Sequence, residues 1–213
     1  MKMYHGTDSA ALLGILSYGA LTHSKISGVR NPFSADHGDN FYPEAVYLTR
    51  DYEIASHYTG VDFHFAVDCL PVILEVEVDL NKDKMFADED AFTGWIKEDD
   101  EWYKFMMKCY EKGLLDNYDI MLNGNEYDFP TPSDIYIQKD IKVMKEYPIE
   151  RCLELFDCIA YNDELPISQI KSMTIYLDVN HQQTTSIITI EEFEKVKQGL
   201  LNKYNNQKQE VVG

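Results

Sequence analysis

Residues 45–58 constrain the fold more than any other stretch, because a β-type segment runs directly into a helical one. Residues 46–49 are mostly β-branched or aromatic, which predicts a short strand. Asp51 is a favourable helix N-cap, and apolar residues follow it at helical spacing. In such a strand-turn-helix, Tyr47 and Tyr58 can converge on one cleft and form a slot for a flat ring. The alternative is a pair of half-buried core tyrosines with solvated hydroxyls.

The composition is that of a soluble globular chain. With 213 residues, of which 45% are apolar and 26% charged, it can form one domain with an added segment. No apolar run is long enough to span a membrane, and the first residues lack the apolar segment of a signal peptide. We therefore expect a cytoplasmic protein, in its own cell or in a host cell, with no membrane partner. The four cysteines lack metal-ligand spacing, so we interpret them as reduced thiols and expect no metal.

The charge balance limits the class of partner. The chain has 19 basic and 37 acidic residues, for a net charge of −18. Stable binding of nucleic acid is disfavoured, because a phosphate backbone needs a basic face. A basic protein partner would be attracted by this negative charge. Plain solubility is an equally good explanation of the charge.

The N-terminal segment predicts a short strand and a helix. Residues 2–4 would form the strand and lead into a His-Gly-Thr turn, and Thr7 or Asp8 would cap a helix that Gly19 ends. Because Gly6 has no Cβ, a ligand could approach the backbone closely there. An ordinary surface turn is the alternative interpretation.

Residues 22–44 form a long segment without periodicity, rich in Gly, Ser, Asn, Pro and Asp. Such loops within a compact domain are usually functional or disordered, and this one could fold over a bound ligand. Arg30 is its only arginine, and a planar guanidinium could bind a diphosphate. A solvated loop arginine is the alternative.

The remaining chain contains further strands and one distinctive segment. Residues 81–130 are acidic and aromatic, which predicts a helical insertion that ends in a loop at 123–125. Other expected elements are strands at 71–80, 134–143 and 171–177, a turn at 180–185, a helix at 190–204 capped by Thr189, and a frayed tail from 205. Residues 155–161 alternate so that Asp157 shares a strand face with apolar side chains. A carboxylate in such surroundings is paired, neutral or functional, because burying an unpaired charge is costly.

Three segments, in this order, resemble the motifs of the ADP-ribosyltransferase superfamily in its His-Tyr-Glu branch, which includes the poly-ADP-ribose polymerases and diphtheria toxin. Residues 4–7 resemble the first motif. Residues 46–58, with two tyrosines eleven positions apart, resemble the second. Residues 157–162 resemble the third, in which the family has Glu, any residue, two aliphatic residues, Tyr and a polar residue.

The resemblance implies an α+β fold in which a split β-sheet clamp holds NAD. It covers residues 1–178, with 81–130 as a helical insertion, and leaves 179–213 as a C-terminal helix and polar tail. Residues 81–150 and the C-terminal helix have no counterpart in the family pattern.

The resemblance also implies a role for each candidate residue. His5 would hold the adenine-side ribose, Gly6 would bond the nicotinamide amide through its backbone, and the two tyrosines would stack the nicotinamide ring. Nicotinamide would leave through an oxocarbenium-like state, which a fixed carboxylate stabilises in a preorganised site. The catalytic candidates are Asp157, His5 and Tyr47. The NAD-binding candidates are His5, Gly6, Thr7, Arg30, Tyr47, Thr49 and Tyr58.

The third motif departs from the family pattern, because Asp157 stands where the family usually has Glu. Its side chain is one methylene shorter, and a misplacement of about 1 Å can cost on the order of 10²-fold in rate. Either the backbone approaches more closely or the activity is weak. Glu154, on the opposite strand face, and Asp134 are the alternative acids, and a site with no acid stays open. Leu155 stands where the arginine-modifying branch has an acid, which disfavours arginine acceptors.

These observations support three hypotheses. The first is a mono-ADP-ribosyltransferase that modifies a macromolecule, a protein in preference to nucleic acid; the short acid favours single transfer over chain elongation. By analogy with the family, its setting would be a toxin or a phage–host conflict. The second is a weak or inactive relative that binds a protein through residues 81–130. The third is ADP-ribosylation of nucleic acid.

Overall fold

The structure, a computed structural model, has an α+β fold with a mostly antiparallel sheet. It describes residues 1–23, 45–59, 70–79, 83–87, 100–113, 121–123, 126–128, 145–178, 181–186 and 189–212. The chain divides into two compact units. The first comprises residues 1–29, 48–80 and 163–213, and the second comprises residues 30–47 and 81–162. Each unit is described by itself.

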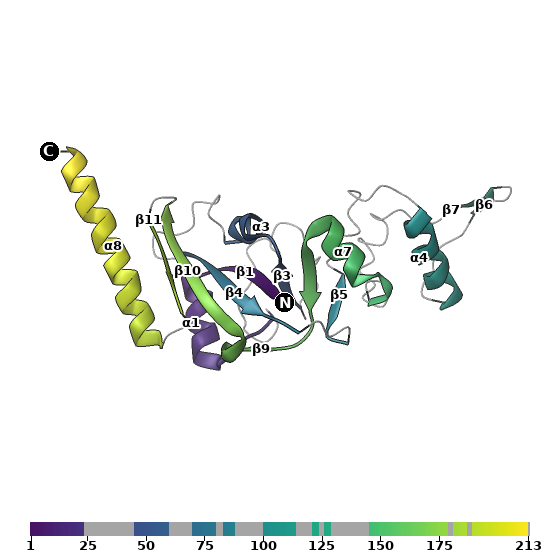
Figure 1. Cartoon of the computed structure of the whole chain (residues 1–213), viewed down its shortest axis with the longest axis horizontal. Helices are drawn as coiled ribbons and strands as arrows, with labels where there is room; N and C mark the ends of the chain where they lie inside the picture. Colours follow the sequence, from purple (N-terminus) through teal and green to yellow (C-terminus); the bar gives the residue numbers. More distant parts are fainter. Residues whose placement is uncertain are drawn as a thin grey trace. The chain divides into compact units, whose positions relative to one another are not determined.

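Four antiparallel strands form the centre of the first unit (Figure 1). In order across the sheet they are β11 (His181–Thr185), β10 (Ile170–Asp178), β4 (Pro71–Glu77) and β1 (Lys2–Asp8). The last two residues of β3 (Val46–Thr49) also belong to this unit, and β3 pairs with β1 through Tyr4 and Thr49. The strands predicted at 46–49, 71–80 and 171–177 are confirmed.

β1 is longer than predicted. All seven of its residues pair with β4, so the His-Gly-Thr segment lies within the strand and not in a turn after it. The prediction was wrong because local signals at a glycine favour a turn. The ladder with β4, about 70 residues away along the chain, keeps the segment extended.

Two helices of this unit begin at aspartate caps, as predicted. The Asp8 carboxylate accepts hydrogen bonds from the N–H groups of Ala10 (2.7 Å) and Ala11 (2.9 Å), at the start of α1 (Ser9–Tyr18). Gly19 ends α1 with a left-handed φ of 90°. Asp51 accepts from the next helix, α3 (Tyr52–His57), in the same way. These bonds satisfy N–H groups that have no partner inside a helix.

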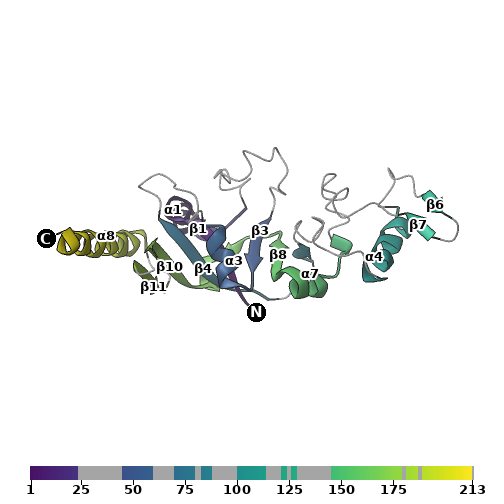
Figure 2. The same ribbon diagram turned by 90° about the horizontal axis from the view of Figure 1, so that it is seen from above.

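A group of buried apolar side chains lies on one face of the sheet of the first unit, and Ile73 of β4 is buried on the other face. Because side chains alternate along a strand, the buried Met3 shares a face with the apolar residues opposite it on β4 and with those of β10. The fully buried residues of this face are Met3, Val72, Leu74, Val76, Met173 and Ile175. Figure 1 draws α1 and α3 on opposite sides of β1 and β4, and Figure 2 gives the same elements seen from above. Leu12 of α1 and Phe193 of α8 are also fully buried.

The C-terminal part contains two departures from prediction. Residues 181–185 form strand β11 and not a turn, because β10 supplies backbone partners to a segment whose polar side chains contain no strand pattern. Helix α8 (Ile190–Val212) continues through the predicted frayed tail, where Gln, Lys and Glu favour helix. A short pair, β2 (Ala20–Leu21) with β9 (Leu165–Pro166), and the 3₁₀ turn η3 (Ile167–Gln169) complete the unit.

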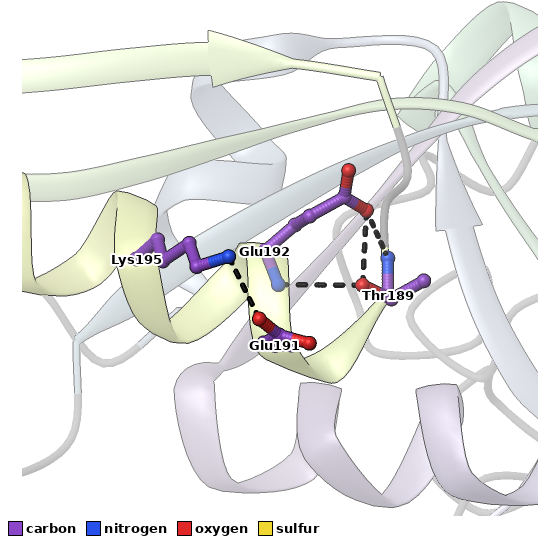
Figure 3. A network of polar contacts seen from close by, with 4 residues as sticks. All are labelled: Thr189, Glu191, Glu192 and Lys195. Carbon is purple, nitrogen blue, oxygen red and sulfur yellow. Dashed lines mark hydrogen bonds and ion pairs between the residues drawn. The ribbon is translucent and has the colours of Figure 1, made fainter.

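Thr189 and Glu192 form a reciprocal cap at the start of α8 (Figure 3). The N–H and Oγ1 of Thr189 both donate to Oε2 of Glu192 at 2.9 Å, and the Glu192 N–H donates to Thr189 Oγ1 at 3.3 Å. The bonds from Thr189 hold the pKa of the Glu192 carboxyl below its usual value. Glu191 pairs with Lys195 on the same turn, at 2.7 Å. The predicted cap is confirmed.

Replacing Thr189 should destabilise α8. We expect Thr189→Ala to lower the free energy of unfolding by about 1 kcal/mol, because it removes the cap. Urea unfolding followed by circular dichroism measures this. Thr189→Ser keeps the hydroxyl and is the control. Equal losses for both variants would contradict a role for the hydrogen bonds.

The described part of the second unit contains two strand pairs and two helices. β5 (Met85–Ala87) pairs antiparallel with β8 (Cys158–Tyr161), and every residue of β8 is buried. Helix α7 (Ile149–Phe156) precedes β8. Further elements are α4 (Asp100–Glu111) and the antiparallel pair β6 (Met121–Asn123) and β7 (Glu126–Asp128). The predicted insertion is therefore helical only in part, and two strands flank its predicted loop.

Helix α4 is joined to the segment before α7 by a ring contact and two ion pairs. Phe105 and Tyr147 meet edge to face at 4.9 Å, and both are buried. Glu146 lies 2.6 Å from Lys112 and 3.0 Å from Lys108. The hydrogen bond from Lys112, followed by that from Lys108, holds the pKa of Glu146 below its usual 4.5.

The lowered pKa of Glu146 predicts an acid-dependent stability. The charged carboxylate stabilises the fold fully above about pH 4.5, and this contribution is lost as the pH falls through the lower folded-state pKa. Glu146→Gln should therefore be less stable than wild type at pH 7, and the difference should shrink as the pH falls below about 4.5. Urea unfolding at pH 7 and at pH 3 tests this. A difference that is as large at pH 3 as at pH 7 would contradict it.

In the part of the chain that the structure describes, no helix is long and apolar enough to cross a membrane. The strand predicted at 134–143 lies outside the described residues, as does most of the segment 22–44.

Candidate site at the edge of strand β1

Strand β1 directs alternate backbone groups to its two edges. Met1 and Val78 exchange backbone hydrogen bonds, and the Ser9 N–H donates to the Leu70 carbonyl at 2.8 Å. In an antiparallel ladder, every second residue faces the same neighbour. The odd-numbered residues of β1 therefore face β4. The backbone N–H and C=O groups of Tyr4 and Gly6 are directed to the opposite edge, on the side of β3.

The pairing on that side is short. β1 pairs with β4 at seven positions, but within the described residues its register with β3 consists of Tyr4 and Thr49 alone. Gly6 lies two positions beyond this pair. Its backbone groups are thus directed to a stretch of the edge that lies past the pairing with β3.

Gly6 also lies against α3. A Cβ built on Gly6 would overlap the carbonyl oxygen of Ala55 and would lie 3.1 Å from Cβ of Tyr58. The space that was expected to admit a ligand is therefore filled by the helix backbone, and that expectation was wrong. A ligand could reach Gly6 along the strand edge and not over its α-carbon.

Tyr58 follows the last residue of α3 and is 48% exposed. The sequence placed it about two turns into a helix, but α3 has only six residues, and Tyr58 is its C-cap. The buried Thr59 holds this end, because its N–H (3.1 Å) and Oγ1 (2.7 Å) both donate to the Ser56 carbonyl. Tyr58 is exposed, and its Cβ lies next to the place that a Gly6 side chain would take.

His5 and Thr7 occupy the other face of β1. They pair with Leu74 and Val72, so their side chains lie on the Met3 face, opposite α3. Both are partly exposed. The structure thus brings Gly6 and Tyr58 together and places the His5 and Thr7 side chains on the opposite face. Their predicted roles toward NAD stay predictions.

Thr49 has a structural contact of its own. Its side chain is buried, and its Oγ1 accepts a hydrogen bond from the Asp51 N–H at 3.0 Å. This bond shapes the turn from β3 into α3. The predicted contact of Thr49 with NAD stays a prediction.

Asp157, in the second unit, is the C-cap of α7 and has a left-handed backbone, with φ 56° and ψ 10°. It is the single non-glycine residue with positive φ among those the structure describes. The predicted strand alternation from residue 155 was wrong, because Leu155 and Glu154 belong to α7. Glu154 is exposed and forms an ion pair with Arg151 at 3.2 Å.

The left-handed backbone supplies a physical reason for aspartate at position 157. Asp and Asn are enriched several-fold at positive φ, whereas other side chains with a Cβ are rare there. A glutamate would adopt this conformation less readily. The residue type that departs from the family pattern is therefore the type that the local backbone favours.

Several candidates stay predictions. Tyr47 is partly exposed in β3 and falls in the second unit, as Asp157 does. Tyr58 belongs to the first unit, so the convergence of Tyr47 and Asp157 with Tyr58 stays a prediction. Arg30 and Asp134 lie outside the described residues.

Two supports of the site were not predicted from the sequence. These are Thr59 and the carbonyl group of Ala55, which occupies the space above Gly6. The only sequence signal was a threonine just after the predicted helix. A hydroxyl there can bond a carbonyl of the last turn.

In the ranges that the structure describes, no group of three His, Cys, Asp or Glu side chains is placed to hold a metal. No family model, curated protein or solved structure matches the chain. Functional assignment therefore rests on the three motifs and on the geometry around Gly6 and Tyr58.

Proposed function

We propose that this protein is an NAD-dependent mono-ADP-ribosyltransferase that modifies a macromolecular acceptor, a protein in preference to nucleic acid. The observation that supports it best is the position of Gly6, with backbone groups directed to the β1 edge beyond Tyr4 and the exposed Tyr58 beside it. A carboxamide can donate to a carbonyl and accept from an N–H of one strand residue, as a neighbouring strand would. An aromatic face nearby suits a flat heterocycle.

In this proposal, the bond between the nicotinamide nitrogen and the anomeric carbon of the ribose breaks, and its electron pair leaves with nicotinamide. The acceptor nucleophile then bonds to that carbon and loses its proton. Positive charge develops on the ribose as the bond breaks, and a fixed carboxylate lowers the energy of that state. Asp157 is the proposed carboxylate.

The net charge indicates the kind of acceptor, and the family resemblance indicates the biological setting. A net charge of −18 favours encounter with a basic protein and disfavours a stable complex with nucleic acid. A transient nucleic-acid substrate needs little affinity, so transfer to a base or end is a separate outcome of the test. The setting of a toxin or of phage–host conflict, in a cytoplasm, comes from the family resemblance.

Labelled NAD tests the activity. We expect incubation with a cell lysate to transfer label from the adenylate side of NAD to macromolecules, and we expect the label to be lost with protease and kept with nuclease. Label lost with nuclease would assign the acceptor to nucleic acid. No transfer and no hydrolysis of NAD would contradict the enzyme.

Calorimetry tests the binding site. Tyr58→Ala should raise the Kd for NAD about tenfold, because an aromatic contact contributes about 0.5–1.5 kcal/mol. Tyr18→Ala is the matched control: Tyr18 is also exposed, at 55%, but it lies on α1 and donates to Glu164 at 2.6 Å. Equal effects of the two substitutions would contradict a ring-binding role for Tyr58.

A protein-binding module without chemistry is the second candidate. The left-handed backbone at position 157 favours it, because it explains aspartate there without catalysis. Wild-type protein that neither binds nor hydrolyses NAD would support this candidate. NAD binding that is lost on Tyr47→Ala would count against it.

A further inference from the structure

Two residues hold the end of α3 from opposite directions. Beneath it, Gly6 has no side chain, which allows the last turn to lie directly on β1, with Tyr58 next to the Gly6 α-carbon. Beyond it, the buried Thr59 donates two hydrogen bonds to Ser56, one from its N–H and one from its hydroxyl. Tyr58 lies between these two residues at the C-cap of α3, and the residue is still 48% exposed.

The close approach at Gly6 is not a requirement of backbone conformation. Gly6 does not have positive φ, whereas Gly19 and Gly113 do, so an alanine could adopt the Gly6 backbone without strain. What excludes a side chain is the Ala55 carbonyl and Tyr58. The residue type at position 6 is therefore tied to the placement of α3.

We infer that Gly6 and Thr59 are positioning residues for Tyr58. The missing side chain of Gly6 and the hydroxyl of Thr59 together fix the height and direction of the Tyr58 ring above β1. Loss of either support moves the ring without removing it. The consequence for NAD rests on the proposed function, whereas the placement of Tyr58 does not.

The placement can be measured without a ligand. With 3-fluorotyrosine incorporated at position 58, the ¹⁹F resonance should shift or broaden in Gly6→Ala and in Thr59→Val. Each substitution has a matched control. Gly14→Ala adds the same methyl group where nothing lies within 4 Å, and Thr59→Ser keeps the hydroxyl. Both controls should leave the resonance unchanged.

An unchanged resonance in Gly6→Ala and Thr59→Val would overturn the inference. Should Gly6→Ala fail to fold, Thr59→Val decides the question alone, because it leaves the contact between Gly6 and Ala55 intact. A resonance that changes equally in Thr59→Ser would also overturn it, since that variant keeps the hydrogen bond.

A double-substitution cycle tests the link to NAD. In the wild-type background, Gly6→Ala should raise the Kd for NAD about tenfold, the effect expected for loss of one aromatic contact. In a Tyr58→Ala background the same substitution should change the Kd less than about twofold, because the ring whose position it changes is already gone. Equal effects in both backgrounds would show that Gly6 acts on NAD without Tyr58, and the positioning role toward NAD would be wrong.

The two failures are distinguishable. If wild-type protein does not bind NAD, the proposed function fails, and the fluorine measurement still decides whether Gly6 and Thr59 place Tyr58. If NAD binds but the resonance is insensitive to both substitutions, the positioning role fails and the proposed function stands.

Discussion

Gly6→Ala is expected to be the most destabilising single-methyl change in the described part of the first unit. The added carbon would overlap the Ala55 carbonyl oxygen, which belongs to the helix backbone and cannot rotate away as a side chain can. Overpacking of this kind typically lowers the free energy of unfolding by about 1–3 kcal/mol. We expect a loss of about 3 kcal/mol here, because the neighbouring atom belongs to the backbone. Urea unfolding at constant pH measures the loss.

Gly14→Ala is the matched control for this stability measurement. Gly14 lies in α1, and a Cβ there meets nothing within 4 Å. Alanine in a helix is favoured over glycine by about 0.5–1 kcal/mol, so this variant should gain stability. Equal stability of the two variants would contradict the packing of α3 on Gly6.

Asp157→Asn is expected to abolish transfer and to leave both the fold and the affinity for NAD nearly unchanged. Asparagine tolerates the left-handed backbone as aspartate does, so the substitution removes only the charge. Loss of one charge-stabilising group in the transition state lowers the rate by on the order of 10²–10³. Single-turnover NAD cleavage, calorimetry and urea unfolding measure the three quantities separately.

Two other substitutions at position 157 separate the effect of the backbone conformation from the effect of the carboxylate charge. Asp157→Gly should keep the left-handed backbone and be inactive, because glycine adopts positive φ without strain and has no carboxylate. Asp157→Glu keeps the charge but places a longer side chain in a left-handed backbone, at a cost of about 1–2 kcal/mol. The family's glutamate should therefore destabilise this chain. If the site is only degraded, its longer reach should still raise the rate in the folded fraction.

An Asp157→Asn protein that transfers ADP-ribose at the wild-type rate would show that another group carries the charge. Glu154 would be the next candidate to replace, although it lies on α7 and pairs with Arg151. Asp134 would follow. Full activity in all three single variants would exclude each of these acids from the reaction.

Local signals in the sequence predicted the N-terminal caps of α1, α3 and α8 and the C-terminal end of α1. Asp8 and Asp51 cap their helices, Gly19 ends α1 with positive φ, and Thr189 forms its reciprocal cap with Glu192. All of these contacts join residues within four positions of one another. Such short-range bonds depend on residue type and spacing, which the sequence contains directly.

Tertiary structure alone decided the features that join distant residues. The His-Gly-Thr segment is a strand because β4 pairs with it, and residues 181–185 are a strand because β10 does. Neither segment has a strand pattern of its own, so no local rule could assign it. Asp157 leaves the predicted alternation because α7 continues to Phe156 and must turn sharply into the buried β8.

The candidate site shows the same division. The sequence alone identified Gly6 and Tyr58 as candidates and placed Tyr58 about two turns into a capped helix, whereas the structure makes it the C-cap. Only the fold revealed that the α3 backbone fills the space above Gly6, and that β1 turns the Gly6 backbone groups toward the edge beyond Tyr4. The reason is physical. Because glycine has no Cβ, a ligand or another segment of backbone can lie against it, and it can also adopt a left-handed conformation. Which of these occupies the space depends on residues some 50 positions away in the chain.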